Sequence, residues 1–161
     1  MLMRRRLLPL ALYVLPAGRP RAQPGVDRPQ PRLPSEPLVI ETGRGPPHRF
    51  TVEMALSAEQ QMIGLMFRTE VKPDEGMLFD WHAPRESAMW MRNTLIPLDM
   101  VFIRADGRIH RIAERTVPQS LNTIESRGPV RATLELAGGT AARLDLRPGD
   151  LVRQRIFGNA D

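Results

Sequence analysis

Apolar and polar residues alternate most regularly over residues 48–56. Every second residue there is apolar, in the order Arg49, Phe50, Thr51, Val52, Glu53, Met54, Ala55, Leu56. A period of two is typical of a β-strand with one buried face. Residues 38–42 form a second apolar run, and Gly43-Arg44-Gly45-Pro46 lies between the two runs. This arrangement predicts a hairpin that pairs the two segments.

The pattern changes to a helical period directly after this strand. Ser57 is followed three residues later by Gln60, which is the spacing of a capping box. Met62, Leu65 and Met66 then form an apolar stripe at helical spacing. We therefore expect a short helix from Ser57 to about residue 67, and a second short helix over residues 138–144.

The rest of the chain consists of short apolar runs separated by turn residues. Strands are predicted over 76–81, 87–92, 98–104, 108–116, 130–136 and 151–157. Asp106-Gly107 lies between two of them and predicts a tight hairpin. Seven or eight short strands with one or two short helices indicate a mainly β fold, a compact barrel or sandwich.

The N-terminal segment has a different composition. Arg4–Arg6 precede the apolar run Leu7–Gly18, and Ala22 follows at a position suited to cleavage. This order is typical of a secretory signal peptide over residues 1–22, and the apolar run is too short to span a bilayer. We expect export to the periplasm or outside the cell, with no membrane-spanning segment after cleavage. Five prolines in residues 23–37 predict an extended linker, which leaves residues 38–161 as a single domain.

The net charge of +5 is not spread evenly along the chain. Residues 1–22 contain five arginines and no acidic residue, so the remaining 18 basic and 18 acidic residues balance to zero. A domain without excess positive charge lacks the attraction for phosphates that nucleic-acid binding needs. The absence of cysteine excludes disulfides and thiolate metal sites, and no motif predicts a cofactor.

Two carboxylates stand in strand-like apolar runs. Asp99 shares a predicted strand face with Val101 and Ile103, and Glu135 lies between two leucines. A carboxylate on an apolar face is either paired with a partner or functional. Three interpretations are open: a structural brace, a ligand contact, or a hydrolase that uses Asp99 and Glu135 together. The hydrolase requires both carboxylates in one cleft, about 5–10 Å apart.

Methionine is abundant between residues 54 and 100. Met89 and Met91 flank a tryptophan, and His82 is close in sequence. Thioethers select soft ions such as Cu(I), so these three residues are candidate metal ligands. Methionine also fills irregular cores, which matters here because only 5% of the residues are aromatic.

The segment Trp90-Met91-Arg92-Asn93-Thr94 combines an aromatic ring with amide, hydroxyl and guanidinium groups. Such groups hold sugars by stacking and hydrogen bonding, whereas an Asn-Thr pair also forms turns. The hypothesis is a site for a small polar ligand, and its contacts would be Arg68, Trp90, Asn93, Thr94 and Asp99.

Several short motifs occur in a familiar order. They are Gly64-Leu65-Met66-Phe67-Arg68, Gly76-Met77-Leu78-Phe79, Trp90-Met91-Arg92-Asn93-Thr94, Pro97-Leu98-Asp99-Met100-Val101-Phe102, Leu134-Glu135-Leu136 with Gly139, and Pro148-Gly149-Asp150. Over about residues 50–152 the chain resembles the domain of unknown function 192 family, also called uncharacterised protein family 0127. Arg92 stands where that family leads us to expect a lysine.

The resemblance implies a small bacterial or archaeal protein, often exported, with a compact β fold and no established activity. Together with the residues, it suggests an exported domain that binds a small polar ligand, either saccharide-like or derived from the cell envelope. The hydrolase and the Cu(I)-binding protein are the alternatives, so the sequence leaves open whether the protein is an enzyme.

Overall fold

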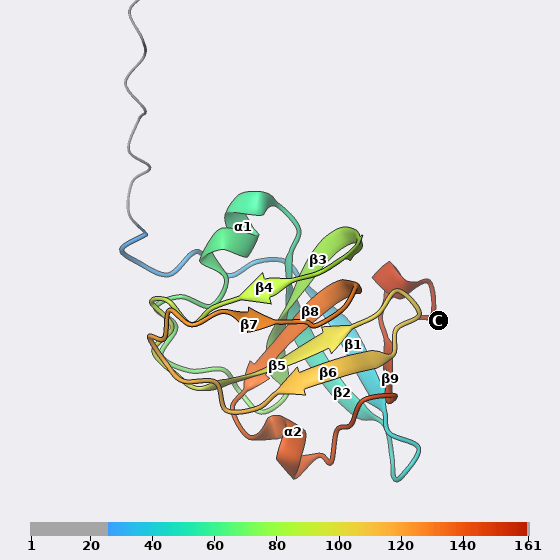
Figure 1. The fold of residues 1–161 in the computed structure, drawn as a ribbon. Coiled ribbons are helices and arrows are strands. Elements are labelled where there is room, and N and C mark those ends of the chain that lie inside the picture. Colours follow the sequence, from blue (N-terminus) through green and yellow to red (C-terminus); the bar gives the residue numbers. More distant parts are fainter. Residues whose placement is uncertain (1–25, 161) are drawn as a thin grey trace, which may run out of the picture.

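The computed structural model describes residues 26–160 of the 161-residue chain. The predicted signal peptide and the first three residues of the predicted linker lie outside these described residues. Within residues 26–160 the chain forms nine strands, two short α-helices and one turn of 3-10 helix (Figure 1). The prediction of a mainly β fold with one or two short helices is confirmed.

The elements follow one another in chain order with short connections. Their bounds are β1 (Ser35–Glu41), β2 (His48–Ala55), α1 (Ala58–Ile63), β3 (Glu75–Arg85), β4 (Ala88–Met89), β5 (Leu98–Ile103), β6 (Ile109–Ala113), β7 (Ile124–Glu125), β8 (Val130–Ala137), α2 (Thr140–Arg143), β9 (Leu151–Arg153) and η1 (Arg155–Phe157). No helix within residues 26–160 combines the length and the apolar character needed to cross a membrane.

Seven of these strands form one curled sheet, in the order β6-β5-β8-β3-β2-β1-β9. β2 and β3 pair in parallel, and the other neighbours in this sheet are antiparallel. The two edges of the sheet meet at a single bridge between Arg108 and Leu151. Two hydrogen bonds support this seam, from Ile109 N to Asp150 O (2.9 Å) and from Val152 N to Gly107 O (2.8 Å). The sheet is therefore a curled half-barrel whose two edges touch over this short stretch.

The local patterns read from the sequence form as predicted. β1 and β2 pair as a hairpin in which Leu38 lies opposite Phe50. At the β5–β6 turn, Gly107 has φ +80°, and a Cβ there would lie 2.7 Å from Val152 O. Glycine is required at this turn both for its backbone conformation and for its closeness to the seam.

The capping box at the start of α1 is present. Gln60 N donates to Ser57 Oγ (3.2 Å), and Ser57 N donates to Gln60 Oε1 (3.0 Å). The helix ends sooner than predicted, at Ile63, because Gly64 adopts φ +51° and packs against Phe79. A left-handed glycine is a common way for a helix to stop.

The sheet separates two hydrophobic clusters. We call the first the barrel core, because it contains residues of both edge strands, such as Ile109 and Val152, and so fills the inside of the curl. We call the second the outer core. It lies on the other face of β3, β5 and β8 and includes Met77, Phe79 and Met100. The outer core is covered by loops and by Leu33 of the N-terminal segment.

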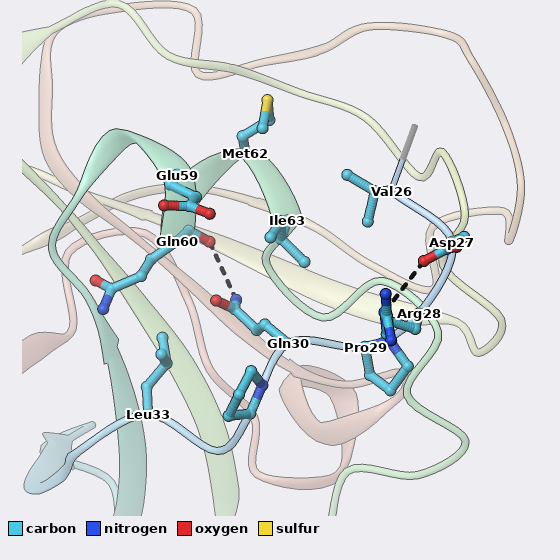
Figure 2. A pocket seen from close by; sticks show the side chains of 11 residues that line it. Val26, Asp27, Arg28, Pro29, Gln30, Leu33, Glu59, Gln60, Met62 and Ile63 are labelled. Carbon is cyan, nitrogen blue, oxygen red and sulfur yellow. Dashed lines mark hydrogen bonds and ion pairs between the residues drawn. The ribbon is translucent and has the colours of Figure 1, made fainter. Parts of the chain in front are cut away.

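The proline-rich segment packs against the domain. β1 begins at Ser35, three residues before the predicted boundary at residue 38. Upstream of it, Gln30 Nε2 donates to Gly64 O (2.9 Å) and to Gln60 O (3.1 Å), which also accepts from Gly64 N (2.8 Å) at the end of α1. We call this segment, residues 26–34, the strap. Figure 2 shows the strap and the cavity of about 630 Å³ beside it. We interpret this cavity as the gap that remains where the strap crosses α1.

Candidate functional site

Glu135 is buried in the outer core, and no charged side chain among residues 26–160 pairs with it. It lies in the middle of β8, where the sheet register places Met77 of β3 and Met100 of β5 on either side of it. Its exposed fraction is 4%, and its Oε2 has no hydrogen-bond partner among the described residues. Burial raises the pKa of this carboxyl from 4.5 to about 8. The protonated acid is therefore the favoured form at neutral pH.

A small inner pocket of about 30 Å³ reaches this acid. Three methionines, a tryptophan and a threonine from separate segments surround it, with Glu135 among the lining residues. The wall consists of Gln61, Met62, Ile63, Gly64, Leu65, Met66, Phe79, Met89, Trp90, Thr94 and Glu135. The pocket has room for a group of about the size of a water molecule.

An open groove of about 510 Å³ adjoins the inner pocket. It runs between α1 and the segment that joins β3 to β4, and both tryptophans of the sequence line it. The two cavities share Gln61, Met62, Met89 and Trp90, so they form one continuous candidate site.

The groove also has polar groups. Ser87 lines it with a buried hydroxyl that has no hydrogen-bond partner among the described residues. The guanidinium of Arg85 lies 4.5 Å from the ring centre of Trp81, and that of Arg92 lies 5.5 Å from the ring centre of Trp90. A guanidinium therefore covers one face of each indole, and the opposite face makes no contact with it.

Asp99 takes the opposite role to Glu135. Its register partner on β8 is Leu136, so it faces the barrel core while Glu135 faces the outer core. Its carboxylate accepts hydrogen bonds from the backbone amides of Arg115 (2.7 Å), Gly139 (3.0 Å) and Ala141 (2.7 Å). The structure thus supports the interpretation of Asp99 as a brace. The paired-carboxylate hydrolase is wrong, because the sheet separates its two acids.

Arg68 is drawn into a buried ion cluster. Its guanidinium contacts Glu53 Oε2 at 3.1 Å, and Arg32 contacts Glu53 Oε1 at 2.7 Å. Glu53 has an exposed fraction of 4%, although the alternation on β2 predicted that it would face solvent. That prediction failed because loops and the strap cover the second face of β2. Arg68 lines neither the groove nor the inner pocket.

Asn93 and Thr94 build a turn beside the inner pocket. Asn93 has φ +55°, its carbonyl accepts from Phe67 N (2.8 Å), and Thr94 N donates to Met91 O (3.0 Å). The side chain of Thr94 is buried and lines the inner pocket. Of the five residues proposed as ligand contacts, only Trp90 and Thr94 therefore lie at the candidate site.

The predicted copper ligands are not brought together. Met91 is buried in the outer core, and its Sδ accepts from Thr116 Oγ1 (3.0 Å). The His82 ring is exposed and its Nε2 lies 2.8 Å from Leu56 O, so only Met89 of the three lines the groove. Among residues 26–160, no group of three or more His, Asp or Glu side chains could hold a metal ion.

No pattern in the sequence predicted a site role for Ser87, Gln61 or Glu53. Ser87 begins a predicted strand, and a hydroxyl there gives no sign that it will be buried. Glu135 did carry a signal, because it interrupts an apolar strand. Its isolation from other charges depends on the packing of loops that are distant in sequence.

Comparison with known proteins gives a relationship but no activity. A crystal structure from Sinorhizobium meliloti, provisionally described as a transcription regulator, is 43% identical; the match covers 79% of this chain and 98% of that one, with a TM-score of 0.76. A Novosphingobium aromaticivorans protein of unknown function is 42% identical over 76% of this chain and 86% of that one, with a TM-score of 0.73. A search of the curated proteins found no match.

The family comparison agrees with these structures and with the motifs in the sequence. The model of the DUF192 family, described as uncharacterised ACR, matches residues 39–154, which span the sheet from β1 to β9. This chain therefore belongs to the DUF192 family, whose function is unknown.

Proposed function

We propose that the groove between α1 and the β3–β4 segment binds a small polar, saccharide-like ligand. One observation carries the proposal: Ser87 Oγ and Glu135 Oε2 are buried without a hydrogen-bond partner among residues 26–160, and their residues line the groove and its inner pocket. Leaving such groups unpaired costs about 1–3 kcal/mol each, which a ligand with matching hydroxyl groups would recover.

The walls of the groove suit the faces of a sugar ring. Trp81 and Trp90 offer indole surfaces, and a sugar ring stacks its C–H face on such a surface. Arg85, Glu86 and Gln61 add donors and acceptors around the same opening. A volume of about 510 Å³ lies within the usual range for small-molecule sites.

Neither catalysis nor nucleic-acid binding is part of this proposal. Asp99, which the hydrolase hypothesis paired with Glu135, lies on the other face of the sheet. The provisional description of the Sinorhizobium relative is not extended to this chain. Residues 26–160 contain 18 basic and 17 acidic residues, so they have little excess charge to attract phosphates.

We also propose that the protein is exported and acts in the periplasm or outside the cell. The support is the order of Arg4–Arg6, the apolar run Leu7–Gly18 and the cleavage position after Ala22. Cell fractionation and mass measurement of the N-terminus test this. Recovery in the cytoplasm with residues 1–22 intact would contradict it.

Intrinsic fluorescence offers a direct test of ligand binding, because both tryptophans of the chain line the groove. The protein is titrated with a panel of mono- and oligosaccharides, including N-acetylated envelope sugars. We expect a saturable change with one class. Trp90→Ala and Ser87→Ala should weaken binding roughly tenfold or more, about 1.4 kcal/mol.

Leu121→Ala is the matched control, because Leu121 is an exposed apolar residue that lines neither the groove nor the inner pocket. It should bind like the unaltered protein. The proposal fails if no sugar gives a saturable change, or if Trp90→Ala and Ser87→Ala bind as tightly as the control.

A further inference from the structure

Three methionines line the inner pocket. Met62 comes from α1, Met66 from the loop after it, and Met89 from β4. Met62 and Met89 also line the groove, so the inner pocket is accessible from the outer opening. In Figure 2 the sulfur of Met62 points away from the strap residue Gln30. Three separate segments thus bring the same soft donor to one small cavity.

These sulfur atoms are available as ligands. Met62 and Met89 make no hydrogen bond through sulfur among the described residues, and Met62 is 47% exposed. Met66 Sδ lies 3.8 Å from Asn93 Nδ2, a weak contact that uses one of its two lone pairs. Met91 differs, because its sulfur is engaged by Thr116 in the outer core.

The size and chemistry of the pocket select the ligand. About 30 Å³ is far too small for a sugar but admits a single ion. Thioethers are soft, neutral donors that favour Cu(I) over hard cations such as Mg²⁺ or Ca²⁺. Trp90 adds an aromatic face to the wall, and such faces attract cations. The chain has no cysteine, so no thiolate competes for the ion.

We propose that the inner pocket binds one Cu(I) ion through the thioethers of Met62, Met66 and Met89, next to the Trp90 indole. The sequence suggested Met89, Met91 and His82 as ligands, and the proposed set keeps only Met89 of these. The inference goes beyond the proposed sugar site and does not depend on it.

Silver(I) is a redox-inert probe for such a site. The intact protein is titrated with silver nitrate in chloride-free buffer while tryptophan fluorescence is recorded. Cu(I) is then measured by competition with bicinchoninate. We expect saturable quenching at one ion per chain. Met62→Leu and Met89→Leu should each weaken binding roughly tenfold, in line with the loss of one ligand or its support.

Leucine preserves the volume of methionine, and Met62 is half exposed, so these variants should fold normally. Circular dichroism checks this. Met91→Leu and His82→Gln are the matched controls and should change the affinity less than about twofold, well below 1 kcal/mol. The proposal is overturned if quenching does not saturate at one ion, or if Met91→Leu weakens binding as much as Met89→Leu. Sugar binding that persists without silver binding would refute this inference alone.

Discussion

Asp99 and Glu135 are both carboxyl groups buried on neighbouring strands, yet the two faces of the sheet treat them differently. In the barrel core, the carboxylate of Asp99 satisfies three backbone amides from two separate segments. In the outer core, Glu135 has a free oxygen, and burial raises its pKa to about 8. The comparison shows that burial alone does not define a role. The hydrogen bonds that come with burial separate a brace from a candidate site.

The strongest way to break this comparison is to remove the brace. Asp99→Ala would leave three amide donors without their acceptor, and two of them belong to the segment that begins α2. We expect a loss of about 3–5 kcal/mol in the free energy of unfolding, measured by urea denaturation.

Asp106→Ala is the control for this variant. Asp106 is exposed and accepts a single turn hydrogen bond, from Arg108 N (3.0 Å). It should cost less than about 1 kcal/mol. If Asp99→Ala lowers the free energy of unfolding no more than Asp106→Ala does, Asp99 is not a brace.

The second test concerns the unpaired acid and its pH dependence. Because the folded state holds the Glu135 proton up to a pKa of about 8, against an ordinary value of 4.5, the folded state binds protons more tightly than the unfolded state. The contribution of Glu135 to stability should therefore be complete below pH 4.5 and be lost progressively as the pH rises to 8. Glu135→Gln cannot ionise, so it should lose this pH dependence.

We expect Glu135→Gln to be more stable than the unaltered protein by about 4 kcal/mol at pH 8, and nearly equal to it at pH 4. Thermal melts of both proteins across this range measure the difference, and all other groups titrate alike in the two chains. A variant that is less stable at pH 8 would mean that the ionised Glu135 has a partner.

The smallest expected effect sharpens the comparison with a third carboxylate. Glu53 is as buried as Glu135 but is paired with Arg32 and Arg68. The Arg32 side chain is 56% exposed, so its ion pair is weakened by solvent. Arg32→Ala should cost about 0.5 kcal/mol, and less at high salt.

Arg28→Ala serves as its control, because the Arg28 side chain is 84% exposed and, within the described residues, its ion pair is with Asp27 of the strap. Chemical denaturation at low and high salt measures both variants. A cost above about 2 kcal/mol for Arg32→Ala would show that Glu53 depends on the strap and not on Arg68.

The sequence predicted what depends on neighbours in the chain. The capping box at Ser57, the hairpin of β1 with β2 and the turn at Gly107 are local signals, and each forms as expected. The family could also be identified, because its motifs are read in order along the chain.

The predictions that failed depended on which loops cover which face of the sheet. The face of Asp99 could be read from its strand, but its three amide partners come from segments 16 to 42 residues away. The burial of Glu53 follows from the strap, and that of Ser87 from a loop. No spacing within a strand encodes these contacts, so the candidate site emerged only from the packed structure.

The seam between the two edges of the sheet has a consequence for biosynthesis. β9 is the last strand in chain order, and it both pairs with β1 and supplies Leu151 to the bridge with Arg108. A nascent chain therefore carries two unpaired strand edges until this segment has left the ribosome. Exposed edges invite pairing with other chains, so this domain relies on its final strand to end its most aggregation-prone interval.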